Sequence, residues 1–155
     1  MLAHEIDFYR MYKVGPTAMA LLTPDLEIID MNDEFQAYVG RPLEEVAGRN
    51  IFEITPKMPE DCGGEPMWTP LEAAMTSGRR EAANLMRYDV EDPDHPGAFL
   101  ERYWAAVAQP IRGPDGQVEV IELSARDITP IISQFRSMQA EEKRSAGRSP
   151  RRAAG

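Results

Sequence analysis

The sequence predicts an α+β fold, in which strands and short helices share one domain. Short apolar runs bounded by prolines, such as Thr17–Thr23, are typical of sheet strands. Between Asn32 and Gly48 the pattern changes to two brief helices, each ending at a glycine. Residues 113–116, Gly-Pro-Asp-Gly, then mark a tight turn between two longer strands.

Length and composition describe one globular domain. The chain has 155 residues, of which 43% are hydrophobic, enough for a packed core. It contains no apolar run of membrane-spanning length, and its first residues lack the basic start and apolar stretch of a secretion signal. The single cysteine, Cys62, excludes an internal disulfide and fits a reducing compartment. We therefore expect a cytoplasmic protein with no membrane partner.

Charge is unevenly distributed along the chain. The net charge is −9, but the segment from Lys143 onward carries five of the 17 basic residues and no acidic one. The remaining chain holds 12 basic against 26 acidic residues, so its folded part repels phosphate backbones and does not favour nucleic acid. We expect the basic tail, residues 145–155, to be disordered and solvated.

A leader segment, residues 1–16, precedes the first strand. Residues Leu2–Tyr12 predict a helix that ends before Gly15-Pro16. This helix either covers the outer face of the sheet or forms a dimer contact, and both roles are compatible. Its candidate contact residues are Ile6, Phe8, Tyr9 and Tyr12.

The first strand, Thr17–Thr23, turns back at Pro24-Asp25 into a second strand, Leu26–Met31. Asn32 follows in the position of a helix N-cap, because its side chain can accept a free backbone N–H of the first turn. Gly40 can take the left-handed conformation that ends this helix.

A second short helix begins at Pro42 and closes at Gly48. Thr55–Pro70 is rich in proline and glycine, which excludes regular secondary structure throughout it. A capped helix then runs from Thr69 to Gly78, and we expect Leu71, Ala74 and Met75 to be its buried stripe.

Three strands complete the predicted sheet: Glu81–Val90, Phe99–Ile111 and Gln117–Arg126. The loop at 91–97 separates the first two, and the turn at 113–116 joins the last two. In the last strand, Ile121, Leu123 and Ala125 alternate with Glu122, Ser124 and Arg126, as expected when one face is solvated.

A C-terminal helix is expected over residues 130–144. Ile131, Phe135 and Met138 form its apolar stripe, which covers only one heptad. Ile131 and Phe135 are therefore further candidates for a dimer contact.

The order of several of these residues resembles the PAS family. Asn32 follows the second strand, Gly40 and Gly48 follow at intervals of eight, and Asp127-Ile128-Thr129 lies near the far end. The resemblance covers residues 17–129. It implies a five-stranded antiparallel sheet of order 2-1-5-4-3, with short helices on its concave face. It also implies a ligand-sensing or interaction domain rather than an enzyme, although fold alone does not fix function.

The phrases at 87–90, Arg-Tyr-Asp-Val, and at 101–104, Glu-Arg-Tyr-Trp, resemble a branch of bacterial PAS sensors attached to kinases or phosphatases. The C-terminal helix resembles the start of a PAS signalling helix. Asp127, Ile128 and Thr129 are therefore the candidate signal relay.

Cofactor motifs of the known PAS branches are missing from this sequence. His4 and His95 do not lie on the helix that carries the haem ligand in haem-binding relatives. Ile51 follows Gly48-Arg49-Asn50 where the flavin-binding LOV branch has its reactive cysteine. Met31 and Phe35 replace the chromophore partners of photoactive yellow proteins, and Cys62 is displaced from their attachment position. The cofactor, if any, stays unknown.

A largely apolar cavity between the short helices and the sheet is the remaining candidate site. The same residues can equally well fill the core. The candidate cavity residues are Phe35, Val39, Ile51, Phe52, Met67, Trp68, Leu71, Met75, Met86, Tyr88, Ile121 and Leu123.

Two functions follow from this sequence. The first is a non-enzymatic PAS sensory module that binds a small apolar or aromatic ligand and relays the event to the C-terminal helix. The second is a ligand-free PAS interaction domain that dimerises or docks to a separate kinase, phosphatase or transcription regulator. In both, a homodimer is the expected assembly.

Overall fold

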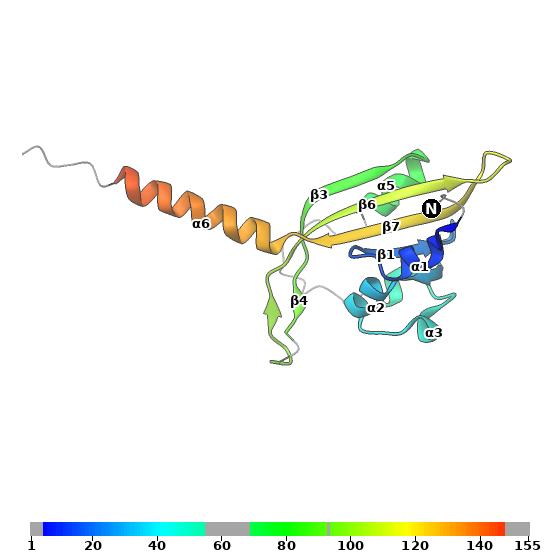
Figure 1. Ribbon diagram of the computed structural model, residues 1–155, viewed down its shortest axis with the longest axis horizontal. Coiled ribbons are helices and arrows are strands. Elements are labelled where there is room, and N and C mark those ends of the chain that lie inside the picture. Colours follow the sequence, from blue (N-terminus) through cyan, green and yellow to red (C-terminus); the bar gives the residue numbers. More distant parts are fainter. Residues whose placement is uncertain (1–4, 55–68, 93, 148–155) are drawn as a thin grey trace, which may run out of the picture.

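A computed structural model describes residues 5–54, 69–92 and 94–147 of the chain. Its centre is a five-stranded antiparallel sheet of order β2-β1-β7-β6-β3. This is the predicted order once the five strands are numbered along the chain. Figure 1 shows α2 beside β1, α5 beside β3 and β6, and α6 extending away from the sheet, while α3 contacts β2.

The helices and strands have the following bounds: α1 Phe8–Lys13, β1 Ala18–Leu22, β2 Ile28–Met31, α2 Asp33–Val39, α3 Leu43–Val46, α4 Ile51–Ile54, α5 Thr69–Ser77, β3 Glu81–Arg87, β4 Val90–Glu91, β5 Phe99–Leu100, β6 Tyr103–Arg112, β7 Val118–Asp127 and α6 Thr129–Ala146.

The sheet buries one face, as the alternation in β7 predicts. Ile121, Leu123 and Ala125 are at most 2% exposed, whereas Arg126 is exposed. The main core cluster joins this face to α2, α4 and α5, with Phe35 at 1% and Leu71 at 0% exposure. The short helices are held by this apolar contact, because helices of four to nine residues are marginal alone.

The predicted N-cap and C-cap of α2 are confirmed. The Asn32 side chain accepts the Phe35 N–H at 3.0 Å, and Gly40 ends the helix with φ of 67°. Gly48 likewise has a positive φ, of 76°. The helix before it is shorter than predicted and ends at Val46.

Several predicted element boundaries were wrong. The second strand begins at Ile28, because Leu26 takes a left-handed φ of 64° and closes a turn onto Thr23. The one-turn helix α4 was not predicted. In α5, Leu71 and Ala74 are buried as expected, but Met75 is 47% exposed.

The predicted third and fourth strands are each interrupted. Glu81–Arg87 stops before Val90, and Phe99–Leu100 is separate from Tyr103–Arg112. The breaks produce a small antiparallel hairpin, β4–β5, in which Val90 pairs with Leu100. Figure 1 shows this hairpin leaving the main sheet next to the start of α6. Its tip lies in the segment predicted as a loop, residues 91–97.

The terminal segments were only partly predicted. The described leader helix is Phe8–Lys13, six residues long and therefore shorter than Leu2–Tyr12. The C-terminal helix runs from Thr129 to Ala146, so Ser145, placed in the disordered tail by the prediction, is helical. The rest of that tail, residues 148–155, lies outside the described residues.

Candidate functional site

Asn32 organises the edge of the candidate site. It is 0% exposed, and its Oδ1 accepts both Met19 N–H at 2.9 Å and Phe35 N–H at 3.0 Å. Its Nδ2 donates to the Thr17 carbonyl at 2.7 Å. One side chain thus ties the start of β1 to the first turn of α2, and this fixes the distance between that helix and the sheet.

A row of four alanines crosses the sheet, and two of them, Ala18 and Ala125, line a groove beside α2. Ala18 pairs with Ala125, Ala125 with Ala106, and Ala106 with Ala83. On the neighbouring row, Leu123 stands between Ala20 and Ala108 and fills the core. The alanine row therefore places only methyl groups on this face of the sheet.

A groove of about 360 Å³ lies where the alanine row meets α2. Tyr38 and Trp104 form its aromatic wall, with ring centroids 4.8 Å apart at a tilt of 62°. Its lining combines small, aromatic and charged side chains: Pro16, Thr17, Ala18, Glu34, Ala37, Tyr38, Trp104, Ala125, Arg126 and Asp127.

The aromatic wall is held in place by buried polar contacts. Trp104 is 6% exposed, and its Nε1–H donates to the Tyr88 carbonyl at 2.9 Å. Burial raises the pKa of Tyr88 to about 12. The pKa of Tyr38 is also raised, mainly by burial. Both phenols therefore stay neutral at physiological pH, because burial disfavours the charged form.

The groove ends at the junction between β7 and α6. Asp127 lines it, and Asp127 Oδ1 accepts the Thr129 N–H at 2.8 Å. Thr129 Oγ1 in turn accepts the Tyr103 N–H at 2.8 Å, and Ile128 N–H donates to the Tyr103 carbonyl at 2.8 Å. Asp127 Oδ2 also lies 4.0 Å from Arg102 Nε. The first turn of α6 is thus bonded to the start of β6.

A second hollow, of about 100 Å³, lies at the opposite end of the concave face. It is lined by Pro24, Ala74, Met75, Pro110, Val118 and Ile121. Its volume corresponds to only a few water molecules at about 30 Å³ each. The groove beside Tyr38 is therefore the better candidate for a ligand.

Comparison with known proteins agrees with this architecture. The family model described as the PAS fold matches residues 13–130, which is most of the chain. The chain belongs to the PAS family. That family consists of sensory and signal-transduction domains.

Solved PAS structures are similar to this PAS domain at low sequence identity. A sensory box sensor histidine kinase from Vibrio cholerae shows a TM-score of 0.51 at 21% identity, covering 79% of this chain and 88% of that one. The PAS domain of nitrogen regulation protein NR(II) from Vibrio parahaemolyticus has a TM-score of 0.55 at 13% identity, with coverages of 79% and 99%. An RNA-binding light-oxygen-voltage receptor has a TM-score of 0.60 at 18% identity, covering 88% of this chain and 36% of that longer one. These likenesses concern the fold.

Most of the predicted cavity residues lie in the packed core of this PAS domain. They are at most 8% exposed and belong to its two core clusters: Phe35, Val39, Ile51, Leu71, Met86, Tyr88, Ile121 and Leu123. Because protein interiors are closely packed, these side chains fill the core.

Two other candidate cavity residues are more exposed. Phe52 is 39% exposed, because the single turn of α4 directs Ile51 and Ile54 inward. Met75 is 47% exposed and lines only the smaller hollow. Met67 and Trp68 lie outside the described residues.

The candidate dimer residues are mostly at the surface. Phe8, Tyr9, Ile131 and Phe135 are 57–63% exposed, and Ile6 is 36% exposed. Tyr12 differs, since it is partly buried and its hydroxyl donates to the Met19 carbonyl at 3.5 Å. Tyr12 therefore attaches the leader to the domain.

Within the described residues, no group of three or more His, Cys, Asp or Glu side chains is arranged to hold a metal ion. In the same part of the chain, the helices are too short or too polar to cross a bilayer.

Sequence reasoning missed the groove itself. Tyr38 and Trp104 were not among the predicted cavity residues, and neither were the alanines. A detectable pattern does exist, because Trp104, Ala106 and Ala108 alternate along β6 with partly exposed residues. Their alignment with Ala18 and Ala125 depends on strand register, which turn chemistry does not fix across distant strands.

Proposed function

We propose that this PAS domain is a non-enzymatic cytoplasmic sensory module. A small, largely aromatic ligand binds in the groove beside Tyr38 and Trp104, and binding is relayed to α6. The observation that carries the proposal is the position of Asp127, which lines the groove and accepts the first N–H of α6.

The dimensions and chemistry of the groove support this class of ligand. Its volume of about 360 Å³ falls in the usual range for small-molecule sites, about 300–1,000 Å³. The alanine floor leaves room for a flat ring, which can stack on the aromatic wall. The lining supplies one cation, Arg126, and two carboxylates, Glu34 and Asp127, for polar substituents of the ligand.

The relay follows from the register of β6 and β7. Trp104 stands opposite Asp127, and its neighbour Tyr103 is bonded to Thr129. A ligand that displaces Trp104 therefore strains the contacts that fix the first turn of α6. Such a ligand shifts α6 only by its differential affinity for two arrangements of the junction.

The ligand claim is tested on protein purified without added ligand. Native mass spectrometry and an absorption spectrum detect a co-purified molecule. A thermal-shift series with indole, benzoate and 4-hydroxybenzoate supplies defined probes. At about 100 times its Kd a probe stabilises the fold by about 2.7 kcal/mol. The Ala37→Phe variant, which fills the groove from α2, should lose that shift.

If no probe raises the melting temperature and no molecule co-purifies, the sensing proposal fails. The Glu44→Phe variant is the matched control, because Glu44 is an exposed residue of α3 that does not line the groove. It should keep the ligand-induced shift of the wild type.

A second candidate function is a ligand-free interaction domain. It is favoured by the exposed apolar side chains of α1 and α6, with Tyr9 at 63%, Phe135 at 58% and Met138 at 54% exposure. These faces suit a homodimer or docking to a separate kinase, phosphatase or transcription regulator. Light scattering of the wild type and of Phe135→Glu separates the cases, since a dimer through α6 should dissociate in the variant.

A further inference from the structure

Arg136, in the second turn of α6, reaches back to the segment before β6. Its Nη1 donates to Glu101 Oε1 at 2.8 Å, and its Nη2 donates to the Tyr103 hydroxyl at 2.6 Å. Its guanidinium also lies 5.0 Å from the centre of the Tyr103 ring. The Arg136 guanidinium thus makes a charge-assisted hydrogen bond to a carboxylate, a hydrogen bond to a phenol and a cation–π contact.

Glu101 has a second cationic neighbour on the other leg of the hairpin. Its Oε2 lies 3.6 Å from Arg87 Nη2. Arg87 forms a bidentate pair with Asp89, in which Nε donates to Oδ1 at 3.0 Å and Nη2 donates to Oδ2 at 2.8 Å. Asp89 is 5% exposed and also accepts the Arg102 N–H at 3.2 Å. We call Asp89, Arg87, Glu101 and Arg136 the hairpin latch.

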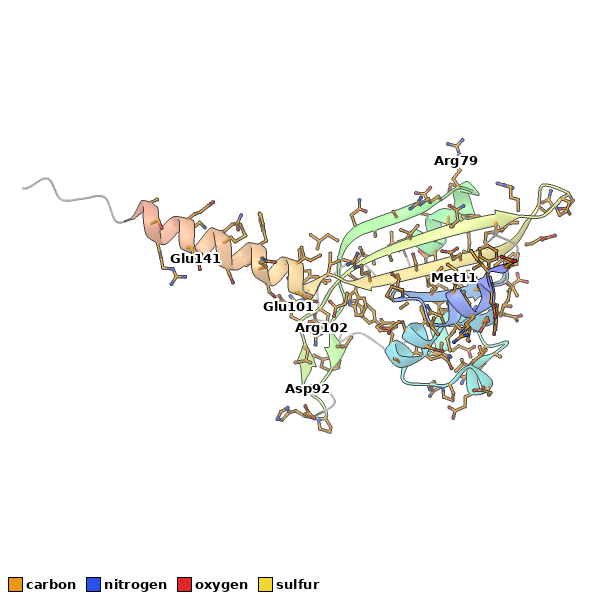
Figure 2. The ribbon with its side chains drawn as sticks, viewed as in Figure 1. Met11, Arg79, Asp92, Glu101, Arg102 and Glu141 are labelled. Carbon is orange, nitrogen blue, oxygen red and sulfur yellow. The ribbon has the colours of Figure 1, made fainter. Side chains whose placement is uncertain are left out.

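The latch alternates in charge and runs from the base of the β4–β5 hairpin to α6. Arg87 and Asp89 precede β4, and Glu101 follows β5, so both legs of the hairpin contribute. Figure 2 shows Glu101 and Arg102 where the hairpin, the sheet and α6 meet, with Asp92 at the far end of the hairpin.

The rest of α6 has little to hold its direction. No residue of α6 is buried, and Figure 1 shows the helix leaving the body of the domain. The bonds at Ile128 and Thr129 fix only its first turn. Arg136 lies about two turns further on, so its bonds form a second attachment point beyond the first turn.

We propose that the β4–β5 hairpin sets the direction of α6 through the hairpin latch, as an input separate from the groove. A movement of the hairpin base pulls Glu101 away from Arg136 and frees the helix beyond its first turn. A single exposed ion pair contributes little, but a network that includes a two-pronged Arg–carboxylate pair holds a defined geometry. The inference rests on the proposed function only in taking α6 as the output element, and it needs no ligand.

The test measures the distance from the sheet to the end of α6. Nitroxide labels are placed at Glu27→Cys and Glu142→Cys in a Cys62→Ser background, and electron–electron double resonance gives the distance distribution. We expect one narrow peak for this parent. Arg136→Gln, Glu101→Gln and Arg87→Gln should each lose the narrow peak. About 1 M salt should broaden the parent too, because it shortens the screening length to about 3 Å.

Arg144→Gln is the matched control, because Arg144 Nε bonds only the Ala140 carbonyl within α6 in the described structure. It should keep the narrow peak. If Arg136→Gln also keeps it, there is no latch. If Arg136→Gln and Glu101→Gln broaden the distribution while Arg87→Gln does not, the hairpin does not control α6 and the proposal is overturned.

Thermal unfolding of each variant shows whether it is folded. If Arg87→Gln is unstable, Glu101→Gln still tests the link between the hairpin and α6, because Glu101 is a partly exposed position. The ligand shifts described above are measured on the same variants. A variant that loses the narrow peak but keeps its ligand-induced stabilisation supports the latch independently of the groove. Failure of every ligand leaves the distance measurement unaffected.

Discussion

The backbone N–H of Tyr103 donates to Thr129 Oγ1 at 2.8 Å, and this bond joins the first residue of β6 to the first residue of α6. It spans 26 residues of sequence. Together with the Asp127 contact to the Thr129 N–H, it makes the junction a bonded corner and not a free linker. The relay that we propose from the groove to α6 runs through this corner.

Replacement of Thr129 by alanine should loosen this corner. The Tyr103 N–H loses its acceptor at a partly buried site, and we expect a loss of about 1 kcal/mol in the free energy of unfolding. Urea denaturation measures it. Thr129→Ser keeps the hydroxyl and should stay within about 0.5 kcal/mol of the wild type. Equal losses in both variants would show that the methyl group and not the hydroxyl matters.

Asn32→Ala should be among the more damaging single changes. It removes the acceptor of two backbone N–H groups and the donor to the Thr17 carbonyl, all at a side chain with 0% exposure. We expect a loss of about 2–4 kcal/mol, because unpaired buried groups cost about 1–3 kcal/mol each. Chemical denaturation of Asn32→Ala and Asn50→Ala makes the comparison. Asn50 bonds at exposed positions, so its variant should lose about 1 kcal/mol or less.

The leader helix depends on Lys13. Its Nζ donates to Asp30 Oδ1 at 3.1 Å and to the Met31 carbonyl at 2.6 Å, and the pair is only 21% and 12% exposed. Lys13→Met should release α1 from β2 and cost about 1–3 kcal/mol, because Asp30 is left without its cation. Hydrogen exchange should then rise across residues 8–14. Unchanged exchange there would show that Tyr12 alone anchors the leader.

The hairpin latch should weaken in acid. The hydrogen bond from Arg136, followed by that with Tyr103, lowers the pKa of Glu101. A lowered native pKa means that the contribution is present above the unfolded value, about 4.3, and is lost as pH falls through the native value. The stability difference between wild type and Glu101→Gln should therefore shrink below about pH 4.3. A difference that stays constant across pH 3–7 would contradict it.

The sequence predicts the frame of this domain well, because local chemistry determines it. Asn32 and Gly40 mark the two ends of α2 by capping and left-handed geometry, and both are confirmed. Ile121 and Leu123 reveal the buried face of β7 by simple alternation. The five-strand order came from the resemblance and is also confirmed.

The parts that sequence could not predict depend on contacts between distant segments. Arg136 and Glu101 are 35 residues apart, and nothing local distinguishes them from other surface charges. At the breaks that create the β4–β5 hairpin, Asp89 accepts the Arg102 N–H, a contact that periodicity does not reveal. Whether Phe52 faces inward was equally undetermined, since a single helical turn has no periodicity to read.

The most direct test of the account is hydrogen exchange across residues 128–136 in the Ala37→Phe variant. Ala37 is an exposed residue of α2 that lines the groove, so a phenyl ring there mimics an occupied site without a ligand. We expect hydrogen exchange to change in the first two turns of α6, and Glu44→Phe to leave it unchanged. A change confined to α2 and its immediate neighbours would contradict the coupling of the groove to α6.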